Sequence, residues 1–203
     1  GSWQLPASRG DTVLLRRLAD HVQRHHFPEL HGRGPDGDAE WFARVCERTA
    51  WMVAGWMRVG FVHGVMNTDN MSILGLTLDY GPFGWIEDFD PDWTPNTTDT
   101  HGRRYRFGAQ PEVAYWNTIR LAQALAPLFD GPAPLEEGLR RYRLARQQAE
   151  RDLVARKLGL AAADAADVAL YGDLCRLLHA GQLDMTLSFR ALGRLDPAAP
   201  DLA

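Results

Sequence analysis

Residues 63–84 read His-Gly-Val-Met-Asn-Thr-Asp-Asn-Met-Ser-Ile-Leu-Gly-Leu-Thr-Leu-Asp-Tyr-Gly-Pro-Phe-Gly. The segment is rich in polar residues and glycine, with two short apolar runs on either side of a central glycine. These runs predict two short strands, at 72–74 and 76–78, that turn at the glycine. Such a hairpin would bring Asn70, before the first strand, close to Asp79, after the second. A carboxylate and an amide oxygen at one point suit a hard divalent cation that also holds phosphate oxygens.

Helical patterns flank this segment on both sides. Asp11 is a good N-cap for a helix over residues 12–26, whose leucines recur at helical spacing. Asp38 predicts the start of a longer helix, which Gly60 ends. After a long polar loop at 87–110, four more helices are predicted. They cover residues 111–129, 135–158, 164–181 and 183–192.

These elements add up to a mainly α-helical fold with one small β-hairpin held between helices. The chain has 203 residues, 45% hydrophobic and 24% charged, which is typical of an ordinary globular protein. Its formal net charge of −4 provides no basic field for nucleic acid or an anionic membrane. The longest apolar run, residues 50–57, is far too short to cross a bilayer. We therefore expect a monomer whose partners include neither nucleic acid nor a membrane.

Several reactive or charged residues outside residues 63–84 are expected to have structural roles. Arg103, Arg104 and Arg106 follow an acidic run, so we expect them to be solvated or to pair with nearby aspartates. Cys46 and Cys175 have no metal-ligand spacing and lie in helical patterns. They are interpreted as two buried thiols, and a bridge between them stays an open alternative.

The polar residues of the segment have the spacing of the protein-kinase catalytic loop, His-Arg-Asp-Leu-x-x-x-Asn. His63 and Asn70 occupy its His and Asn positions, and Asp79-Tyr-Gly stands where kinases have Asp-Phe-Gly. Val65 occupies the position of the usual catalytic Asp and cannot accept a proton, whereas Asp69 offers a carboxylate beside Asn70. His63 is interpreted as a hydrogen-bonded structural residue without a chemical role. Together these residues favour a kinase-type nucleotide and metal site.

The same segment closely resembles the signature of the selenoprotein O family. The resemblance extends over all of residues 63–84 and is therefore highly specific. Further segments resemble the family at Arg9-Gly-Asp-Thr12, Phe89-Asp-Pro91, Asn96, Gln110-Pro-Glu-Val113 and Trp116-Asn117. Residues 1–130 carry the strong part of the resemblance, and the remaining residues resemble the family more loosely.

This resemblance implies a protein-kinase-like fold and a pseudokinase-like loop that lacks the usual catalytic Asp. It implies protein adenylylation (AMPylation), in which ATP binds in a flipped orientation. AMP then passes to a Ser, Thr or Tyr hydroxyl of a protein substrate, and pyrophosphate leaves. Carried over residue by residue, Asp69 corresponds to the general base. Asn70 and Asp79 correspond to the ligands of Mg²⁺ or Mn²⁺, and Asp79 also to a residue near the nucleotide phosphates.

The chain departs from the family pattern in what precedes this segment. Family members carry an N-lobe with a Gly-rich loop and a nucleotide-binding lysine, but no such loop precedes residue 60. Of the 22 basic residues only Lys157 is a lysine, and it lies well after Asp79 in a helical pattern. We therefore expect residues 1–203 to be a partial kinase-like catalytic domain, a C-lobe without the N-lobe and the C-terminal extension. Alone, it should bind ATP weakly or not at all and be inactive.

Two alternatives remain open at the level of sequence. The same metal ligands would serve a kinase-type phosphotransferase that binds ATP in the ordinary orientation. The chain as it stands would instead be a non-catalytic binding or regulatory module if it does not bind nucleotide. The resemblance implies a cytoplasmic enzyme in a bacterium or a mitochondrial one in a eukaryote.

Overall fold

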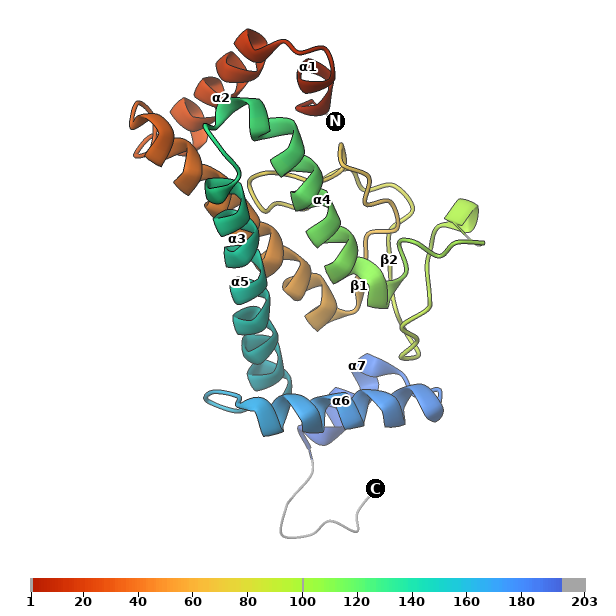
Figure 1. The fold of residues 1–203 in the computed structure, drawn as a ribbon. Helices are drawn as coiled ribbons and strands as arrows, with labels where there is room; N and C mark the ends of the chain where they lie inside the picture. Colours follow the sequence, from red (N-terminus) through yellow and green to blue (C-terminus); the bar gives the residue numbers. More distant parts are fainter. Residues whose placement is uncertain (1, 100, 195–203) are drawn as a thin grey trace.

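A computed structural model describes residues 2–99 and 101–194, and this part of the chain is mainly helical with a two-stranded antiparallel sheet. In chain order the elements are α1 (Gln4–Ser8), α2 (Thr12–His26), α3 (Gly34–Val59), β1 (Phe61–Val62), β2 (Gly84–Trp85), α4 (Gln110–Leu125), α5 (Ala133–Leu158), α6 (Ala165–Ala180) and α7 (Met185–Leu192). Short 3-10 turns lie at Thr97–Asp99, Phe107–Ala109 and Ala126–Leu128. Figure 1 shows α1 and α2 at the top, α3 to α5 through the middle, and α6 and α7 across the bottom. The predicted mainly α-helical fold is confirmed, and the small antiparallel sheet is present but does not come from the predicted hairpin.

Local capping signals set several of the helix ends. The Asp11 carboxylate accepts a hydrogen bond from the N–H of Leu14 at 2.8 Å and begins α2, and Asp164 caps α6 in the same way. α3 and α5 end at Gly60 and Gly159. Their φ angles of 72° and 69° lie in the left-handed region that favours glycine. These four predicted ends are confirmed, because the signals act within a few residues of the end itself.

The start of α3 differs from the prediction. The helix begins at Gly34, with Pro35 in its first turn, so the expected cap Asp38 lies about one turn inside it. Asp38 is only 4% exposed and accepts hydrogen bonds from two residues of α2. Arg16 donates to it at 2.5 and 2.9 Å, and Gln23 donates at 2.6 Å. The carboxylate is therefore a buried link between two helices rather than a cap.

We expect Asp38→Asn to lower the free energy of unfolding by about 2 kcal/mol. The substitution keeps the size of the side chain but removes the negative charge that faces the Arg16 guanidinium. Urea denaturation followed by circular dichroism measures the change. Asp36→Asn alters an exposed carboxylate in the first turn of the same helix and should change stability by less than about 0.5 kcal/mol. Equal losses in the two variants would show that the buried pair contributes nothing.

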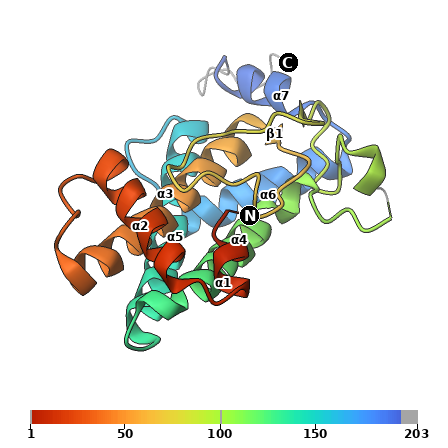
Figure 2. The ribbon, with the colours of Figure 1, turned by 90° about the horizontal axis from the view of Figure 1, so that it is seen from above.

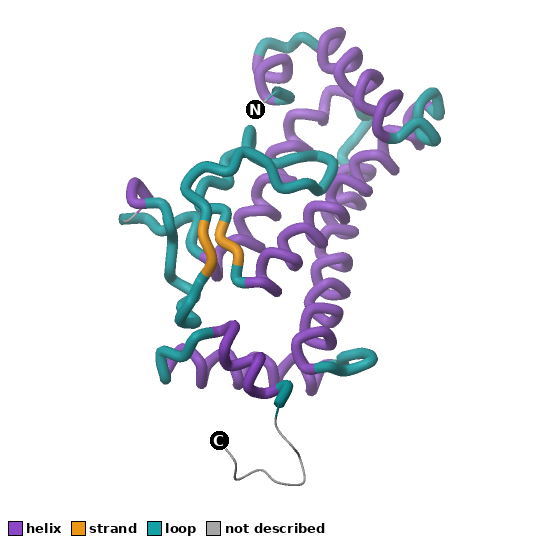
Figure 3. The backbone as a smooth tube through the Cα atoms, turned by 180° about the vertical axis from the view of Figure 1, so that it is seen from behind, coloured by secondary structure: helices purple, strands orange, loops and turns teal. Residues whose placement is uncertain are grey.

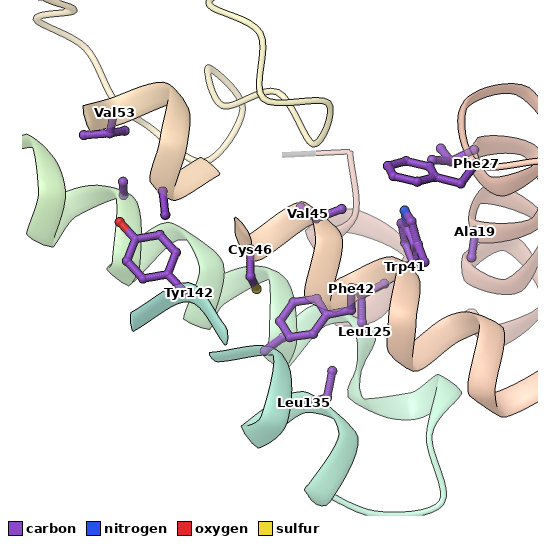
Figure 4. Close-up of a cluster of buried hydrophobic side chains, with 14 of the residues drawn as sticks. Ala19, Phe27, Trp41, Phe42, Val45, Cys46, Val53, Leu125, Leu135 and Tyr142 are labelled. Atoms are coloured by element: carbon purple, nitrogen blue, oxygen red, sulfur yellow. The ribbon is translucent and has the colours of Figure 1, made fainter. Parts of the chain in front are cut away.

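Helix α3 forms the centre of the hydrophobic core. Trp41 and Phe42 on this helix are fully buried. Figure 4 shows Trp41 directed towards Phe27 and α2, whereas Phe42 lies beside Leu135 of α5. The two long helices approach closely because Gly138 of α5 faces Phe42, where a Cβ atom would lie 2.4 Å from Phe42 Cδ1. Each such large side chain contributes about 1.5–3 kcal/mol on burial, so α3 organises the packing of its neighbours.

Both cysteines are free thiols. Cys46 lies buried on α3, while Cys175 is half-buried on α6. Burial raises the pKa of both thiols, which is the opposite of what activates a cysteine as a nucleophile. The structural interpretation is thus confirmed for Cys46, and Cys175 is more exposed than expected.

The sheet does not lie where the sequence predicts it. Residues 72–74 and 76–78 form turns and irregular loop, so the predicted hairpin is wrong. The sheet instead pairs β1 with β2, and its register places Phe61 opposite Trp85. The two strands therefore pair at the two ends of residues 63–83 and not in the middle of that segment.

Residues 71–78 have strand-like composition, but they use their side chains to contact the helices. Ile73 and Leu74 pack against the main core. The indole N–H of Trp56 on α3 donates to Thr77 Oγ1 at 2.8 Å. Gly75 has a φ of 70°, and a Cβ atom there would lie 2.8 Å from Arg48 Cβ of α3. The segment lies directly on α3, and these contacts outweigh its tendency to form strands.

The sheet and the loops of residues 60–99 and 101–109 gather on one side of the helices, as Figure 3 shows. Helix α7 supports them, because Met185 packs with Val62, Ile86 and Phe107 in a second buried cluster. In the view from above, α7 lies at the top of the molecule and α2 at its left (Figure 2). Every helix in the part of the chain that the structure describes falls short of the length or the hydropathy that a membrane-spanning helix needs.

Candidate active site

The candidate residues lie on one long loop, residues 63–83, which the β1–β2 pair closes at its base (Figure 1). The outgoing and returning limbs touch at Gly64. This glycine has a φ of 79°, and a Cβ atom there would lie 2.3 Å from the carbonyl oxygen of Pro82. A side chain is excluded by both the backbone angle and the contact. The glycine therefore permits the two limbs to lie side by side.

His63 joins the two limbs through its ring. The residue is 2% exposed, and its Nε2 lies 2.9 Å from the carbonyl oxygen of Leu78, the residue before Asp79. Its Nδ1 accepts a hydrogen bond from the N–H of Val65 at 3.4 Å. The tautomer with its hydrogen on Nε2 satisfies both contacts, since that nitrogen then donates to Leu78. The interpretation of His63 as a hydrogen-bonded structural residue is confirmed.

Three buried amide side chains fix the backbone of the outgoing limb. Gln110, which is fully buried, donates from Nε2 to the carbonyl oxygen of Phe61 and accepts from the N–H of His63, both at 2.9 Å. Asn96 donates to the carbonyl oxygen of Gly64 at 3.0 Å, and Asn117 donates to that of Met66 at 2.9 Å. An amide can donate and accept without introducing a charge, so it suits buried backbone partners.

The sequence indicates no role for these three amides beyond their place in segments that resemble the family. Gln110 and Asn117 stand seven residues apart on α4, which places them on one helix face. Polar residues that recur on a buried face are a signal for internal hydrogen bonds. This signal is in the sequence, but the backbone groups that they bind cannot be identified from it.

We expect Gln110→Leu to lower the free energy of unfolding by about 3 kcal/mol. The leucine fits a buried position but leaves one backbone carbonyl and one backbone N–H without partners. Denaturation by urea measures the loss of stability, and hydrogen exchange at the His63 amide reports the lost contact directly. Gln147→Leu, on the exposed surface of α5, is the matched control and should change stability by less than about 0.5 kcal/mol. An unchanged exchange rate at His63 would contradict the assigned role.

Asn70 is anchored through its amide nitrogen. Its Nδ2 donates at 3.1 Å to the carbonyl oxygen of Val65, the residue that replaces the usual kinase Asp. Its backbone N–H donates to the carbonyl oxygen of Asn67 at 3.0 Å. Its Oδ1 has no hydrogen-bond partner within residues 2–99 and 101–194. The side chain is thus oriented by the protein while its oxygen stays available to a ligand.

The two candidate carboxylates are exposed. Asp69 and Asp79 have no hydrogen-bond or ion-pair partner for their carboxylates among the described residues. The backbone of Asp79 is left-handed, with a φ of 56°, and its carbonyl oxygen accepts from the N–H of Gly81 at 2.7 Å. Non-glycine residues adopt this conformation rarely, at a cost of about 1–3 kcal/mol, and such residues cluster at functional sites.

Both predicted metal ligands are connected to residues 63–65 by hydrogen bonds. The Asn70 side chain donates to the carbonyl oxygen of Val65, and the carbonyl oxygen of Leu78, the residue before Asp79, contacts the His63 ring. The predicted cause of their approach, a hairpin at 72–78, is wrong. That Asn70 and Asp79 hold one cation stays a prediction.

The donor set fits a cation that also binds a nucleotide. Within the described residues, no three His, Cys, Asp or Glu side chains are gathered so as to hold a metal ion. Mg²⁺ is commonly bound by one or two carboxylates together with substrate phosphates and water, rather than by an all-protein cage. An available amide oxygen on Asn70 and an unpaired carboxylate on Asp79 match that pattern.

Two arginines that follow the loop and the single lysine have partners of their own. Arg106 forms an ion pair with Asp92 at 2.9 Å, as predicted. The Arg104 guanidinium lies over the ring of Trp116, 4.5 Å from its centroid. Lys157 belongs to α5, and its Nζ lies 4.4 Å from the centroid of the Phe189 ring of α7. Burial, with a further contribution from the charge of Arg58, lowers the pKa of Lys157.

An exposed aromatic patch follows Asp79 directly. Its members are Tyr80, Phe83 and Trp85, which are 60%, 40% and 54% exposed. Each of them contacts the buried ring of Phe61, with centroids 5.4–6.4 Å apart. Contiguous exposed apolar surface of this kind marks interaction sites.

Comparison with known proteins agrees with the resemblance of residues 63–84. The sequence model of a family described as "Protein adenylyltransferase SelO" matches residues 1–199. A relative from Xanthomonas campestris pv. campestris (strain 8004), named "Protein nucleotidyltransferase YdiU", is 59% identical over 201 residues, which are 99% of this chain and 39% of the relative.

Two further relatives carry the same name. They come from Xanthomonas oryzae pv. oryzae (strain MAFF 311018) and Xanthomonas axonopodis pv. citri (strain 306). They are 59% and 60% identical over 203 residues, which are 100% of this chain and 39% of each relative. The chain thus spans about 39% of the length of these curated relatives. A family match over nearly the whole chain, together with this identity, shows that the chain belongs to the protein adenylyltransferase SelO family.

Proposed function

We propose that these residues are the C-lobe part of a kinase-like protein adenylyltransferase, which transfers AMP from ATP to Ser, Thr or Tyr hydroxyls of proteins. The observation that carries the proposal is the contrast within residues 63–83. The backbone of the outgoing limb is fixed by buried amides, while the side-chain oxygens of Asp69, Asn70 and Asp79 have no partners in the described protein. A loop with a fixed backbone, one available carboxylate for a base and two available oxygen ligands for a cation is suited to phosphate chemistry.

The proposed reaction assigns the proton transfer to Asp69. Its carboxylate takes the proton of the acceptor hydroxyl as the hydroxyl oxygen forms a bond to the α-phosphorus of ATP. The bond between the α-phosphorus and the bridging oxygen breaks, and pyrophosphate leaves with that electron pair. Asp69 is exposed and unpaired, so a protein hydroxyl can approach it without displacing an internal contact.

Asn70 and Asp79 would hold Mg²⁺ or Mn²⁺, and Asp79 would also lie next to the phosphates. A bound divalent cation neutralises the charge that develops on the phosphate oxygens. The bond from Asn70 to Val65 turns the amide so that its oxygen, the better ligand for a hard cation, is the free atom. His63 supports Asp79 through the preceding carbonyl group.

The aromatic patch formed by Tyr80, Phe83 and Trp85 supports the assignment to a C-lobe. It offers apolar surface beside the candidate phosphate ligands, where an N-lobe would pack in a complete kinase-like enzyme. The relatives have further chain to supply such a lobe, because the matched part is 39% of their length.

Labelled ATP tests the reaction type. The full-length enzyme for this test is the Xanthomonas campestris relative with its matching part replaced by this chain. It is incubated with a protein mixture and with ATP that is labelled at either the α- or the γ-phosphorus. AMP transfer incorporates the α-label only. Incorporation of the γ-label would establish phosphoryl transfer instead, and incorporation of neither label would contradict a transferase.

The isolated 203-residue chain should bind MgATP with a Kd above about 1 mM. The described residues supply two candidate cation ligands on an exposed loop, and those two alone cannot enclose a triphosphate. Calorimetric titration measures the affinity, and the full-length enzyme in the same titration is the positive control. Micromolar binding by the 203 residues would contradict their assignment to a part of the nucleotide site.

A further inference from the structure

A tight turn presents the candidate base Asp69. The N–H of Asn70 donates to the carbonyl oxygen of Asn67 at 3.0 Å, so Thr68 and Asp69 are the two central residues of a β-turn. The Asp69 carboxylate has no hydrogen-bond or ion-pair partner in the described residues. The backbone of the turn, rather than a side-chain contact with those residues, therefore determines where this carboxylate lies.

The first residue of this turn is held from a distant part of the chain. The hydroxyl of Tyr105 donates to Asn67 Oδ1 at 2.5 Å, across 38 positions of sequence. The last residue of the turn, Asn70, donates from its Nδ2 to the carbonyl oxygen of Val65 at 3.1 Å. The turn is thus held at both ends, and the contact at Asn67 comes from outside residues 63–83.

Tyr105 is itself fixed by its neighbours. It is half-buried, and its ring packs against the main core. Its backbone N–H donates to Asp99 Oδ2 at 2.7 Å, and the Arg104 guanidinium lies 5.7 Å from the centroid of its ring. The N–H of Asp99 donates to the carbonyl oxygen of Asn96, whose side chain holds the backbone of Gly64. The outgoing limb is therefore held at two points by linked residues of the following loop.

We propose that Tyr105 is a positioning residue for the transfer reaction, a role that rests on the proposed function of Asp69 as the general base. The Tyr105 hydroxyl holds the Asn67 side chain and, through it, the orientation of the turn that carries Asp69. The contact lies at the surface, where water can replace a lost hydrogen bond, so its removal costs little stability. The rate is far more sensitive, because a displacement of about 1 Å in a catalytic group can slow a reaction by roughly 10²-fold.

The full-length enzyme with Tyr105→Phe tests this role, because the substitution removes the hydroxyl and keeps the ring. We expect kcat for AMP transfer to fall about tenfold, while the affinity for MgATP stays within about twofold of wild type. The melting temperature should fall by less than about 2 °C. Tyr171→Phe is the matched control, since it removes a hydroxyl that contacts Cys175 on α6, and it should keep the wild-type kcat. A wild-type kcat in Tyr105→Phe would overturn the proposal.

Double variants distinguish the positioning of the base from a general structural effect. In an Asp69→Asn background, Tyr105→Phe should slow the residual transfer by less than about twofold, because the base that it positions is already lost. Asn67→Leu should reproduce the loss seen in Tyr105→Phe, and the two substitutions together should be no slower than either alone. Equal losses from Tyr105→Phe with and without Asp69, or multiplied losses with Asn67→Leu, would refute action through these two residues.

Hydrogen exchange at the Asn70 amide of the full-length enzyme tests the link independently of the reaction. This N–H closes the turn, so it should exchange at least about threefold faster in Tyr105→Phe and at the wild-type rate in Tyr171→Phe. An unchanged rate in Tyr105→Phe would overturn the proposal even where AMP transfer is established. Failure of the proposed function is observed separately, as a wild-type enzyme that does not incorporate the α-label.

Discussion

The full-length enzyme with Asp79→Ala should show no measurable AMP transfer, a fall of at least about 10³-fold in kcat/KM. Asp79 supplies the one carboxylate of the proposed ligand pair, so its loss leaves the cation with the uncharged amide of Asn70. The structure predicts that the effect is chemical rather than structural. The Asp79 carboxylate is exposed and has no partner in the described residues, so the fold loses no side-chain contact.

Incorporation of α-labelled ATP into protein measures this loss, and the melting temperature of the variant checks the fold. Asp79→Asn is a second variant, because asparagine tolerates the left-handed backbone at this position while removing the charge. Asp130→Ala, an exposed carboxylate between α4 and α5, is the control and should keep the wild-type rate. Wild-type transfer by both Asp79 variants would remove Asp79 from the metal site.

Asp69→Ala should slow AMP transfer about 10²- to 10⁴-fold while the affinity for MgATP stays within about twofold of wild type. The reason is that a general base acts on the acceptor hydroxyl, whereas the nucleotide and its cation are held by Asn70 and Asp79. The transfer rate and the MgATP affinity together distinguish a general base from a metal ligand, because loss of a metal ligand would weaken nucleotide binding as well. Parallel titration and transfer assays on one preparation provide both values.

A full transfer rate in Asp69→Ala would show that the general-base assignment is wrong. Asp69→Asn is the matched variant, since it keeps the size of the side chain but cannot accept the proton. Equal losses in the two variants are expected. A much smaller loss for asparagine would indicate that the residue orients the acceptor hydroxyl by a hydrogen bond.

The parts of the fold that follow from short-range chemistry are predictable from the sequence. Asp11, Asp164, Gly60 and Gly159 end or begin helices through contacts or backbone angles within a few residues. Asp38 has the same residue type as the other caps, but its partners come from a different helix. In the sequence, a helix-capping aspartate therefore cannot be distinguished from a buried aspartate that binds another helix until the packing of α2 on α3 is known.

The sheet shows the same limit. Residues 72–78 have the composition of strands, yet their contacts with α3 are decided by tertiary packing. The real pair, β1 and β2, consists of strands of two residues each, too short to give an alternating pattern. Spacing and family resemblance single out Asp69 as the candidate base and Asn70 and Asp79 as the candidate metal ligands. The hydrogen bonds of Asn96, Gln110 and Asn117 cannot be predicted from local sequence patterns, because each amide binds a backbone group far away in the chain.

That distance has a consequence for how the molecule folds. The amide side chains reach the backbone of residues 61–66 across 32 to 51 positions of sequence. Contacts of such separation form late, because the intervening chain must first lose much of its freedom. Helices α3 and α4 must therefore dock before the candidate active-site loop acquires its shape. A folding intermediate with nearly complete helicity would still lack that loop, so helix content overestimates the fraction of competent molecules during refolding.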